Sequence, residues 1–306
     1  MRSASARTGG LTTAPMVSQP GTAVAVGAQA YHRGVILAVD IGNSAAKAAA
    51  VEGATVHESG RLDTSAADAE DLLDGLRVLA AVPDDPPTAI VTVSVVDRWT
   101  ERLDWAAGEM GLPLTVVAAS HIPISTALLR PDKAGPDRLL AAWAAASILG
   151  TPVIVVDLGT ATTVDAVDAD GFFLGGAILP GLGLAADSLA EGTARLPRID
   201  VELPAAAIGD DTTSAIASGV VIGHIGAVRE LAGRMHAQMD RGGEAAPTKV
   251  VITGGFSEAR WATDAWLTPS GDLPAIADRL DHELVVRGLG LLAEHMAVRP
   301  DPGASR

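Results

Sequence analysis

The stretch ILAVDIGNS has residues whose types and spacing could bind an anion. A run of apolar residues ends at Asp40, Gly42, Asn43 and Ser44 follow within four positions, and Lys47 lies on the next apolar run. Glycine lets backbone N–H groups approach an anion closely, and the serine hydroxyl adds a donor. Aspartate would repel phosphate directly but can meet it through a cation. A plain strand–turn–strand is the structural alternative, and a solvent-exposed side chain is the alternative for Lys47.

A second stretch, VIVVDLGTATTVD, repeats this pattern about 120 residues later. Asp157 ends the apolar run, Gly159 follows in the turn, and Thr160 and Thr162 add hydroxyl donors. Two matching turns favour phosphate binding over a purely structural role. The repeat also predicts an internal duplication, with two similar lobes that face each other across a ligand-binding cleft.

Two further motifs, GPDR and ITGG, carry residues suited to the same chemistry. Asp137 and Arg138 begin a helical pattern, where the acid could act as a base and the arginine as an anion clamp. The structural alternative for Asp137 is an acid that complements the helix dipole. Gly254 and Gly255 end a strand pattern and would let a flat base or ribose approach the backbone. A plain strand-to-helix loop fits the same glycines.

The elements expected to position these motifs alternate between strands and helices. Short β-rich runs bounded by turn residues predict strands within 35–53, 86–96, 113–119, 153–176 and 249–255. Helical spacing of apolar residues predicts helices at 68–82, 135–150, 212–239 and 285–297. Pro136 fits the first turn of the second helix, and Gly150 can end it. This alternation predicts an α/β fold.

Length and composition restrict the class of protein. The 306 residues, 48% of them hydrophobic, can form one large or two ordinary domains and exclude wholesale disorder. The formal charge of −15 opposes nucleic-acid binding, and the absence of cysteine excludes disulfides and thiolate metal sites. No apolar run reaches about 18 residues, so we expect no membrane span and a cytoplasmic location. We expect a disordered tail at 1–34, lobes at 35–150 and 151–298, and a tail at 299–306.

The motifs DIGNS, GPDR, DLGTATTVD, GGAILPGLGL, TARLP and ITGG, in this order and spacing, resemble those of the type III pantothenate kinases. The likeness runs from about Val35 to Glu294. It implies two duplicated ribonuclease-H-like lobes, the actin-like ATPase fold, with a central cleft. It also implies ATP-dependent phosphorylation of pantothenate to 4'-phosphopantothenate, the first step of coenzyme A biosynthesis. The resemblance further implies a homodimer whose acceptor pocket borrows from the partner subunit.

The resemblance also implies roles for the matched residues. The segment 40–47 would be the first ATP-phosphate loop, with Asp40 linked to phosphate through Mg²⁺, and Thr160 would contact ATP. Asp157 would bind a monovalent cation, K⁺ or NH₄⁺. Asp137 would be the general base that accepts the proton of the acceptor hydroxyl.

Residues on the acceptor side are also implied by the resemblance. Gly135, Pro136 and Arg138 would lie along the acceptor, and Thr212 in GDDTTSA would bind it. Pro136 itself departs from the family's pattern, because it stands where alanine is expected.

Two more departures lie on this side: Leu128 stands where a tyrosine is expected, and Arg130 where an asparagine is expected. Leu128 lacks the hydroxyl, and Arg130 adds a fixed cation. Two alternatives therefore stay open, a kinase of the same fold with a different small hydroxylated acceptor and a non-catalytic regulatory relative. The retention of Asp40, Asp137 and Asp157 argues against the second.

Overall fold

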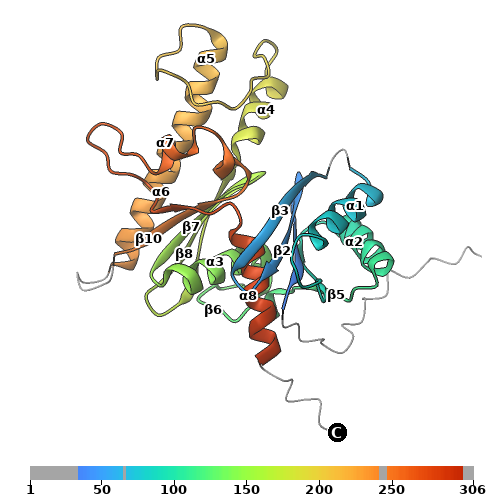
Figure 1. Cartoon of the computed structure of the whole chain (residues 1–306). Coiled ribbons are helices and arrows are strands. Elements are labelled where there is room, and N and C mark those ends of the chain that lie inside the picture. The colour runs from blue at the N-terminus through green and yellow to red at the C-terminus, as the bar shows by residue number, and fades with distance from the viewer. Residues whose placement is uncertain (1–33, 65–66, 241–246, 299–306) are drawn as a thin grey trace, which may run out of the picture.

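Two β-sheets form the frame of the fold (Figure 1). The computed structural model describes residues 34–64, 67–240 and 247–298, so the expected tails lie outside the described residues apart from Gly34. The first sheet has the order β3-β2-β1-β4-β5, with β1 (Ile36–Ile41), β2 (Ala45–Glu52), β3 (Thr55–Asp63), β4 (Ile90–Ser94) and β5 (Leu114–Val116). The second has the order β11-β10-β7-β8-β9-β6, with β6 (Ser125–Thr126), β7 (Val153–Leu158), β8 (Ala161–Val167), β9 (Phe172–Pro180), β10 (Lys249–Thr253) and β11 (Arg279–Leu280).

Both sheets follow the same path. In the first, β1, β2 and β3 form an antiparallel meander, and β4 and β5 continue the sheet in parallel on the other side of β1. In the second, β7, β8 and β9 form the meander, and β10 and β11 continue in parallel beside β7. Short β6 is added next to β9. This repeated order confirms the expected duplication into two ribonuclease-H-like lobes, which is the actin-like ATPase fold.

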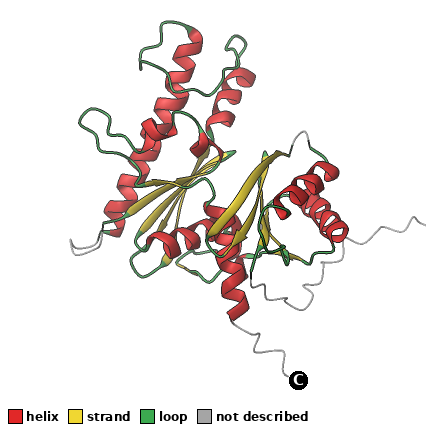
Figure 2. Cartoon of the chain, viewed as in Figure 1, coloured by secondary structure: helices red, strands yellow, loops and turns green. Residues whose placement is uncertain are grey.

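Helices cover the sheets on both sides (Figure 2). On the outer face of the first sheet lie α1 (Ala69–Ala80) and α2 (Asp97–Met110). Between the two sheets lie α3 (Pro136–Leu149) and α8 (Leu284–Val298). On the outer face of the second sheet lie α4 (Leu182–Gly192), α5 (Thr212–Ala217), a π-helical segment (Ser218–Ile222), α6 (Gly223–Met239) and α7 (Ala262–Trp266). Short 3₁₀ turns occur at Ala119–His121, Pro131–Lys133 and Gly255–Glu258.

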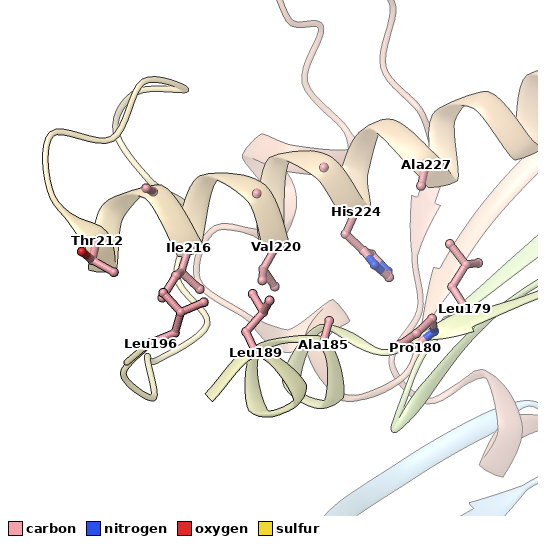
Figure 3. A pocket seen from close by; sticks show the side chains of 13 residues that line it. Leu179, Pro180, Ala185, Leu189, Leu196, Thr212, Ile216, Val220, His224 and Ala227 are labelled. Carbon is pink, nitrogen blue, oxygen red and sulfur yellow. The ribbon is translucent and has the colours of Figure 1, made fainter. Parts of the chain in front are cut away.

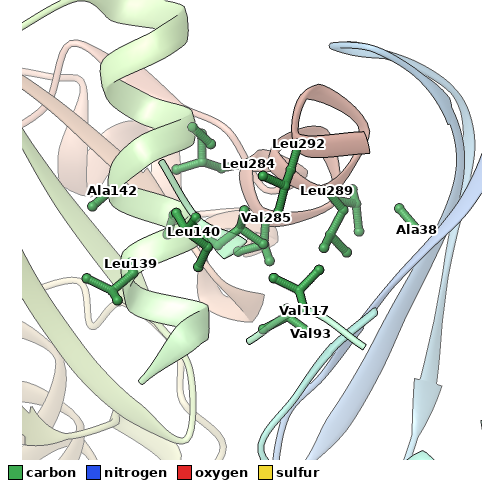
Figure 4. Packing of buried hydrophobic residues seen from close by; sticks show 14 of the residues in the cluster. Ala38, Val93, Val117, Leu139, Leu140, Ala142, Leu284, Val285, Leu289 and Leu292 are labelled. Carbon is green, nitrogen blue, oxygen red and sulfur yellow. The ribbon is translucent and has the colours of Figure 1, made fainter. Parts of the chain in front are cut away.

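The apolar cluster between the sheets joins the two lobes (Figure 4). Leu140 of α3 and Leu289 of α8 are fully buried there, and Ala38 and Val93 of the first sheet belong to the same cluster. Burying one such leucine contributes about 1.5–3 kcal/mol. This packing holds the two sheets in a fixed relation, which the site between them requires.

The division of the chain into lobes at residue 150 stays a prediction. Strand β6 comes from the chain before that point, yet it pairs with β9 of the second sheet. Helix α8 comes from the chain after that point, yet it packs on β1 and β2 of the first sheet. A boundary at residue 150 would therefore assign β6 and α8 to a different lobe from the one whose strands they contact.

The longest helical run, Thr212–Met239, was expected as a helix but not as a candidate membrane span. It has 28 residues, and its most apolar window has a mean hydropathy of 1.3, with 33% of that window buried. By length and composition alone such a run could cross a membrane, a weak criterion that core helices also meet.

Candidate active site

The alternation of side chains along two strands places two aspartates on the same inner surface. On β1, Ala38 faces the core between the sheets, so Asp40, two residues further, faces the same side. On β7, Val155 faces that core, so Asp157 does likewise. Both carboxylates therefore point into the space between the lobes, at the ends of matching strands.

A third carboxylate comes from the start of α3. Gly135 is the N-cap residue, Pro136 is the first helical residue, and Asp137 lies in the first turn. Proline is favoured at this position because its missing N–H has no partner in a helix anyway. Asp137 lies close enough to Asp40 and Asp157 for its charge to raise the pKa of both.

These carboxylates line a cavity of about 610 Å³ between the lobes. Its size is within the range of ligand-binding pockets, about 300–1,000 Å³. It brings together most of the sequence-predicted residues: Asp40, Gly42, Asn43, Ser44, Lys47, Asp137, Arg138, Asp157, Gly159, Thr160, Gly254 and Gly255. Four others do not line it: Gly135, Pro136, Thr162 and Thr212.

Two carboxyls in this cavity, those of Asp40 and Asp157, have a raised pKa and hold protons more strongly than usual. Burial, together with the charges of Asp157 and Asp137, raises the pKa of Asp40 to about 7, although Lys47 opposes the rise. Burial, together with the charges of Asp137 and Asp165, raises the pKa of Asp157 to about 7. Burial is the largest cause of both rises in pKa, and a bound cation would favour the ionised form of each carboxyl.

The two matching turns touch each other across the cavity. The Ser44 and Thr160 hydroxyl oxygens are 2.6 Å apart, which is a hydrogen bond between the lobes. A glycine behind the second turn lets the chain after β9 pack closely against that turn. A Cβ on Gly181 would overlap the Gly159 and Thr160 carbonyl oxygens, and the Gly181 N–H donates to Thr160 O at 3.0 Å.

The ITGG motif approaches the same turn from β10. Gly254 has φ of 86°, and a Cβ there would overlap the Asp157 carboxylate and the Leu158 backbone. The motif therefore forms the wall of the cavity beside Asp157, and only glycine allows that approach.

Lys47 and Arg138 both have partners in the cavity wall. The Lys47 ammonium donates to Glu258 Oε1 at 2.5 Å and to the His282 carbonyl at 2.9 Å. Arg138 forms a two-point ion pair with buried Asp165, with Nε donating to Oδ2 at 3.0 Å. The solvent-exposed alternative for Lys47 does not apply, because Lys47 joins the two lobes.

Thr162 does not reach the cavity. It is fully buried, and its hydroxyl lies 3.0 Å from Nε2 of His224 on α6. Burial lowers the pKa of His224, so the imidazole is neutral near pH 7. Thr163, the next residue along β8, lines the cavity instead. Thr162 therefore supports the second turn from behind.

Thr212 lies in a different cavity, of about 720 Å³, between α4 and the α5–α6 run (Figure 3). This α4–α6 groove is lined mainly by apolar residues, among them Leu189, Ile216 and Val220, with Thr212 at its end. Within one chain, Thr212 and Asp137 therefore line separate cavities.

Leu128 and Arg130, which also depart from the family's pattern, do not line the cavity either. Leu128 packs against the core between the sheets, beside Gly175. Arg130 is exposed and donates twice to the carboxylate of Asp132, at 3.0 and 2.9 Å. Its added charge is thus compensated locally, within the loop that precedes α3.

Sequence reasoning missed several residues of the cavity, namely Arg61, Thr163, Asp187 and Glu258, and the supporting Asp165. The alternation along β8 was a usable signal. Val164 packs in the apolar cluster on the outer face of the second sheet, and Thr162 points to the same face. Thr163 and Asp165 must therefore point to the opposite face, toward the cavity. Arg61 and Glu258 gave no comparable signal, because their strand and turn partners are distant in sequence.

The residues present fit a nucleotide with its cations. Carboxylate oxygens are ligands for Mg²⁺ and K⁺, and Mg²⁺ is commonly held by one or two carboxylates plus substrate phosphates. Within 34–64, 67–240 and 247–298, no group of three or more His, Cys, Asp or Glu has the geometry to hold a metal ion. A cation here would therefore share its coordination with ligand or water oxygens.

The family model and the curated proteins that match this chain name the same family. The model of the type III pantothenate kinase family matches residues 36–234. The chain is 37% identical to the type III pantothenate kinase of Rubrobacter xylanophilus over 232 residues, 73% of this chain and 87% of that one. It is 36% identical to that of Thermus thermophilus over 262 residues, 83% and 97% of the two chains. Among solved structures, it is similar to the activator of 2-hydroxyisocaproyl-CoA dehydratase from Clostridium difficile, with a TM-score of 0.46 and 14% identity over 86% and 96% of the chains. On the family match and these relatives, the chain belongs to the type III pantothenate kinase family.

Proposed function

We propose that the protein transfers the terminal phosphate of ATP to pantothenate, forming 4'-phosphopantothenate in the first step of coenzyme A biosynthesis. The observation that carries this proposal is the convergence of Asp40, Asp137 and Asp157 in one cavity between two matching turns. The acceptor follows from family membership, since the relatives are named type III pantothenate kinases.

Asp137 is the residue we assign to proton transfer. It lies in the first turn of α3 and lines the cavity, where it would accept the acceptor's hydroxyl proton as that oxygen attacks the phosphate. Arg138 beside it is fixed by Asp165 and would hold the acceptor side of the cavity. Gly135 and Pro136 would contribute by directing the start of the helix.

The two turns would hold the phosphates. Gly42, Asn43 and Ser44 offer backbone and side-chain donors from the first turn, and Gly159 and Thr160 do so from the second. Mg²⁺, when bound, would neutralise charge on the transferring phosphate, and Asp40 would be the carboxylate that holds it. Gly254 and Gly255 would face the base or ribose.

Asp157 is the residue we assign to a monovalent cation, K⁺ or NH₄⁺. Burial, first, and the charges of Asp137 and Asp165 all raise its pKa. A cation beside it would lower its pKa again and keep the carboxylate ionised.

We also propose that two copies associate through the α4–α6 groove. This surface is apolar, because it is lined by Leu189 of α4, which is 36% exposed, and by Ile216 and Val220. Pairing there would bury these side chains and could bring Thr212 of one subunit toward the acceptor of the other. Such an enzyme would act in the cytoplasm, without a nucleic-acid or membrane partner.

The test is ADP release by purified protein with ATP, Mg²⁺ and K⁺, with pantothenate and with a panel of other small hydroxylated acceptors. Turnover that depends on pantothenate supports the proposal. Turnover only with another acceptor would favour the alternative kinase. ATP binding without turnover on any acceptor would favour the regulatory relative.

A further inference from the structure

The basic side chains of the nucleotide cavity are unequally engaged. The cavity is lined by the arginines Arg61 and Arg138 and by Lys47. Lys47 is paired with Glu258, and Arg138 is paired with Asp165. Among the described residues Arg61 makes no hydrogen bond and no ion pair, and its one recorded interaction is at longer range, where its charge helps to lower the pKa of Glu258.

Strand register explains why Arg61 faces this cavity. Asp40 of β1 lies opposite Lys47 of β2, and Lys47 lies opposite Arg61 of β3. Residues opposite one another in a sheet project from the same face, so the three form one row toward the cavity. The guanidinium crosses to the second lobe, where a Cβ on Gly255 would overlap its Nη1 atom.

The charge of the cavity makes an unpaired guanidinium there significant. Its acidic lining residues are Asp40, Asp137, Asp157, Asp187 and Glu258. A polyphosphate that enters meets this negative charge, and both other cations already have carboxylate partners. A guanidinium has donors arranged to bind phosphate oxygens in pairs, and its charge does not depend on pH in the working range.

We propose that Arg61 binds the phosphate chain of the nucleotide, reaching across the cleft from the edge strand of the first lobe. This inference rests on the proposed kinase function and adds a specificity-determining residue to it. Because Arg61 is exposed and makes no hydrogen bond or ion pair within the described region, its replacement should leave the fold intact.

The test compares wild type, Arg61→Gln, Arg61→Lys and the control Arg77→Gln. Arg77 is an exposed arginine on α1, outside the cavity, with Asp74 at 3.7 Å, so its loss gives the same change in net charge. Calorimetry measures the Kd of MgATP, and inhibition of turnover measures the affinity of adenosine, which has no phosphate. Thermal unfolding checks that each variant is folded.

We expect Arg61→Gln to weaken MgATP binding about 10- to 100-fold and to leave adenosine within about twofold. Arg61→Lys should recover part of the loss, and Arg77→Gln should match wild type. Unchanged ATP affinity in folded Arg61→Gln would overturn the inference but not the kinase function. Equal losses for ATP and adenosine would also overturn it, since the contact would then be to the base or ribose. A wild-type protein that binds no ATP would overturn the kinase function itself, and this inference with it.

Discussion

The two aspartate turns share a sequence pattern and a place in their lobes, but their surroundings differ in charge. Lys47 lies opposite Asp40, and its charge opposes the rise in the pKa of that carboxyl. Asp157 is surrounded by Asp137 and Asp165, and each of them raises its pKa further. We infer that Lys47 compensates part of the charge of Asp40, whereas Asp157 needs a cation from solution.

The largest effect is expected at Asp137, which lies between the two turns. Asp137→Asn keeps the size of the side chain but removes the base, so turnover should fall about 10²- to 10⁴-fold. ATP should still bind, because both turns remain. Steady-state kinetics and calorimetry on the same preparation check both parts. A loss of ATP affinity as large as the loss of turnover would place Asp137 in nucleotide binding instead.

The second expected effect separates the two turns. Asp157→Asn should abolish the dependence of turnover on K⁺, whereas Asp40→Asn should retain it at a lower rate. Without its cation, Asp157 is a source of repulsion, so Asp157→Asn should stabilise ligand-free protein at pH 8 by on the order of 2 kcal/mol. Chemical denaturation in K⁺-free buffer measures this. Equal K⁺ dependence in both variants would contradict the comparison.

The third prediction concerns pH. Asp40 and Asp157 keep their protons in the folded protein up to about pH 7, whereas the ordinary aspartate value is 3.8. Unfolding therefore releases protons between those values, and the contribution of these two groups to stability falls as pH rises from about 4 to about 7. The free energy of unfolding of ligand-free wild type, minus that of Asp40→Asn/Asp157→Asn, should fall across that window. A difference that is flat or rises with pH would show that the carboxyls titrate normally.

The smallest effect is expected at the contact between the turns. Ser44→Ala and Thr160→Ala each remove the hydrogen bond at 2.6 Å, and each should cost about 1 kcal/mol or less of unfolding free energy. A double-mutant cycle should show that the second substitution costs less once the first is made. Strict additivity would mean that the two lobes do not interact at this point.

Sequence patterns were sufficient for the framework that carries the turns. The apolar runs before Asp40 and Asp157 correspond to β1 and β7, and the Pro136–Gly150 punctuation marks the ends of α3. These signals are local, because apolar periodicity and proline or glycine at helix ends act within a few residues.

Other elements lacked such signals. Helix α2 begins after Val96, whose apolar side chain cannot cap the helix by a hydrogen bond. The edge strand β3 is polar and has few apolar residues. Missing β3 also meant missing Arg61. Thr162 was expected to contact ATP, but its hydroxyl lies beside His224 of α6 instead. No local pattern could reveal this contact, because the two residues are 62 positions apart in the sequence. Contacts between distant segments depend on how the elements pack, which one sequence does not reveal.

The most direct test of the account is the formation of 4'-phosphopantothenate from pantothenate and ATP, followed by mass spectrometry. Wild type and Asp137→Asn are compared, with Asp74→Asn on α1, outside the cavity, as a control for loss of one carboxylate. We predict product in wild type and Asp74→Asn, and at least about a 10²-fold lower rate in Asp137→Asn. Absence of product in wild type with Mg²⁺ and K⁺ present, or equal rates in all three proteins, would contradict the account.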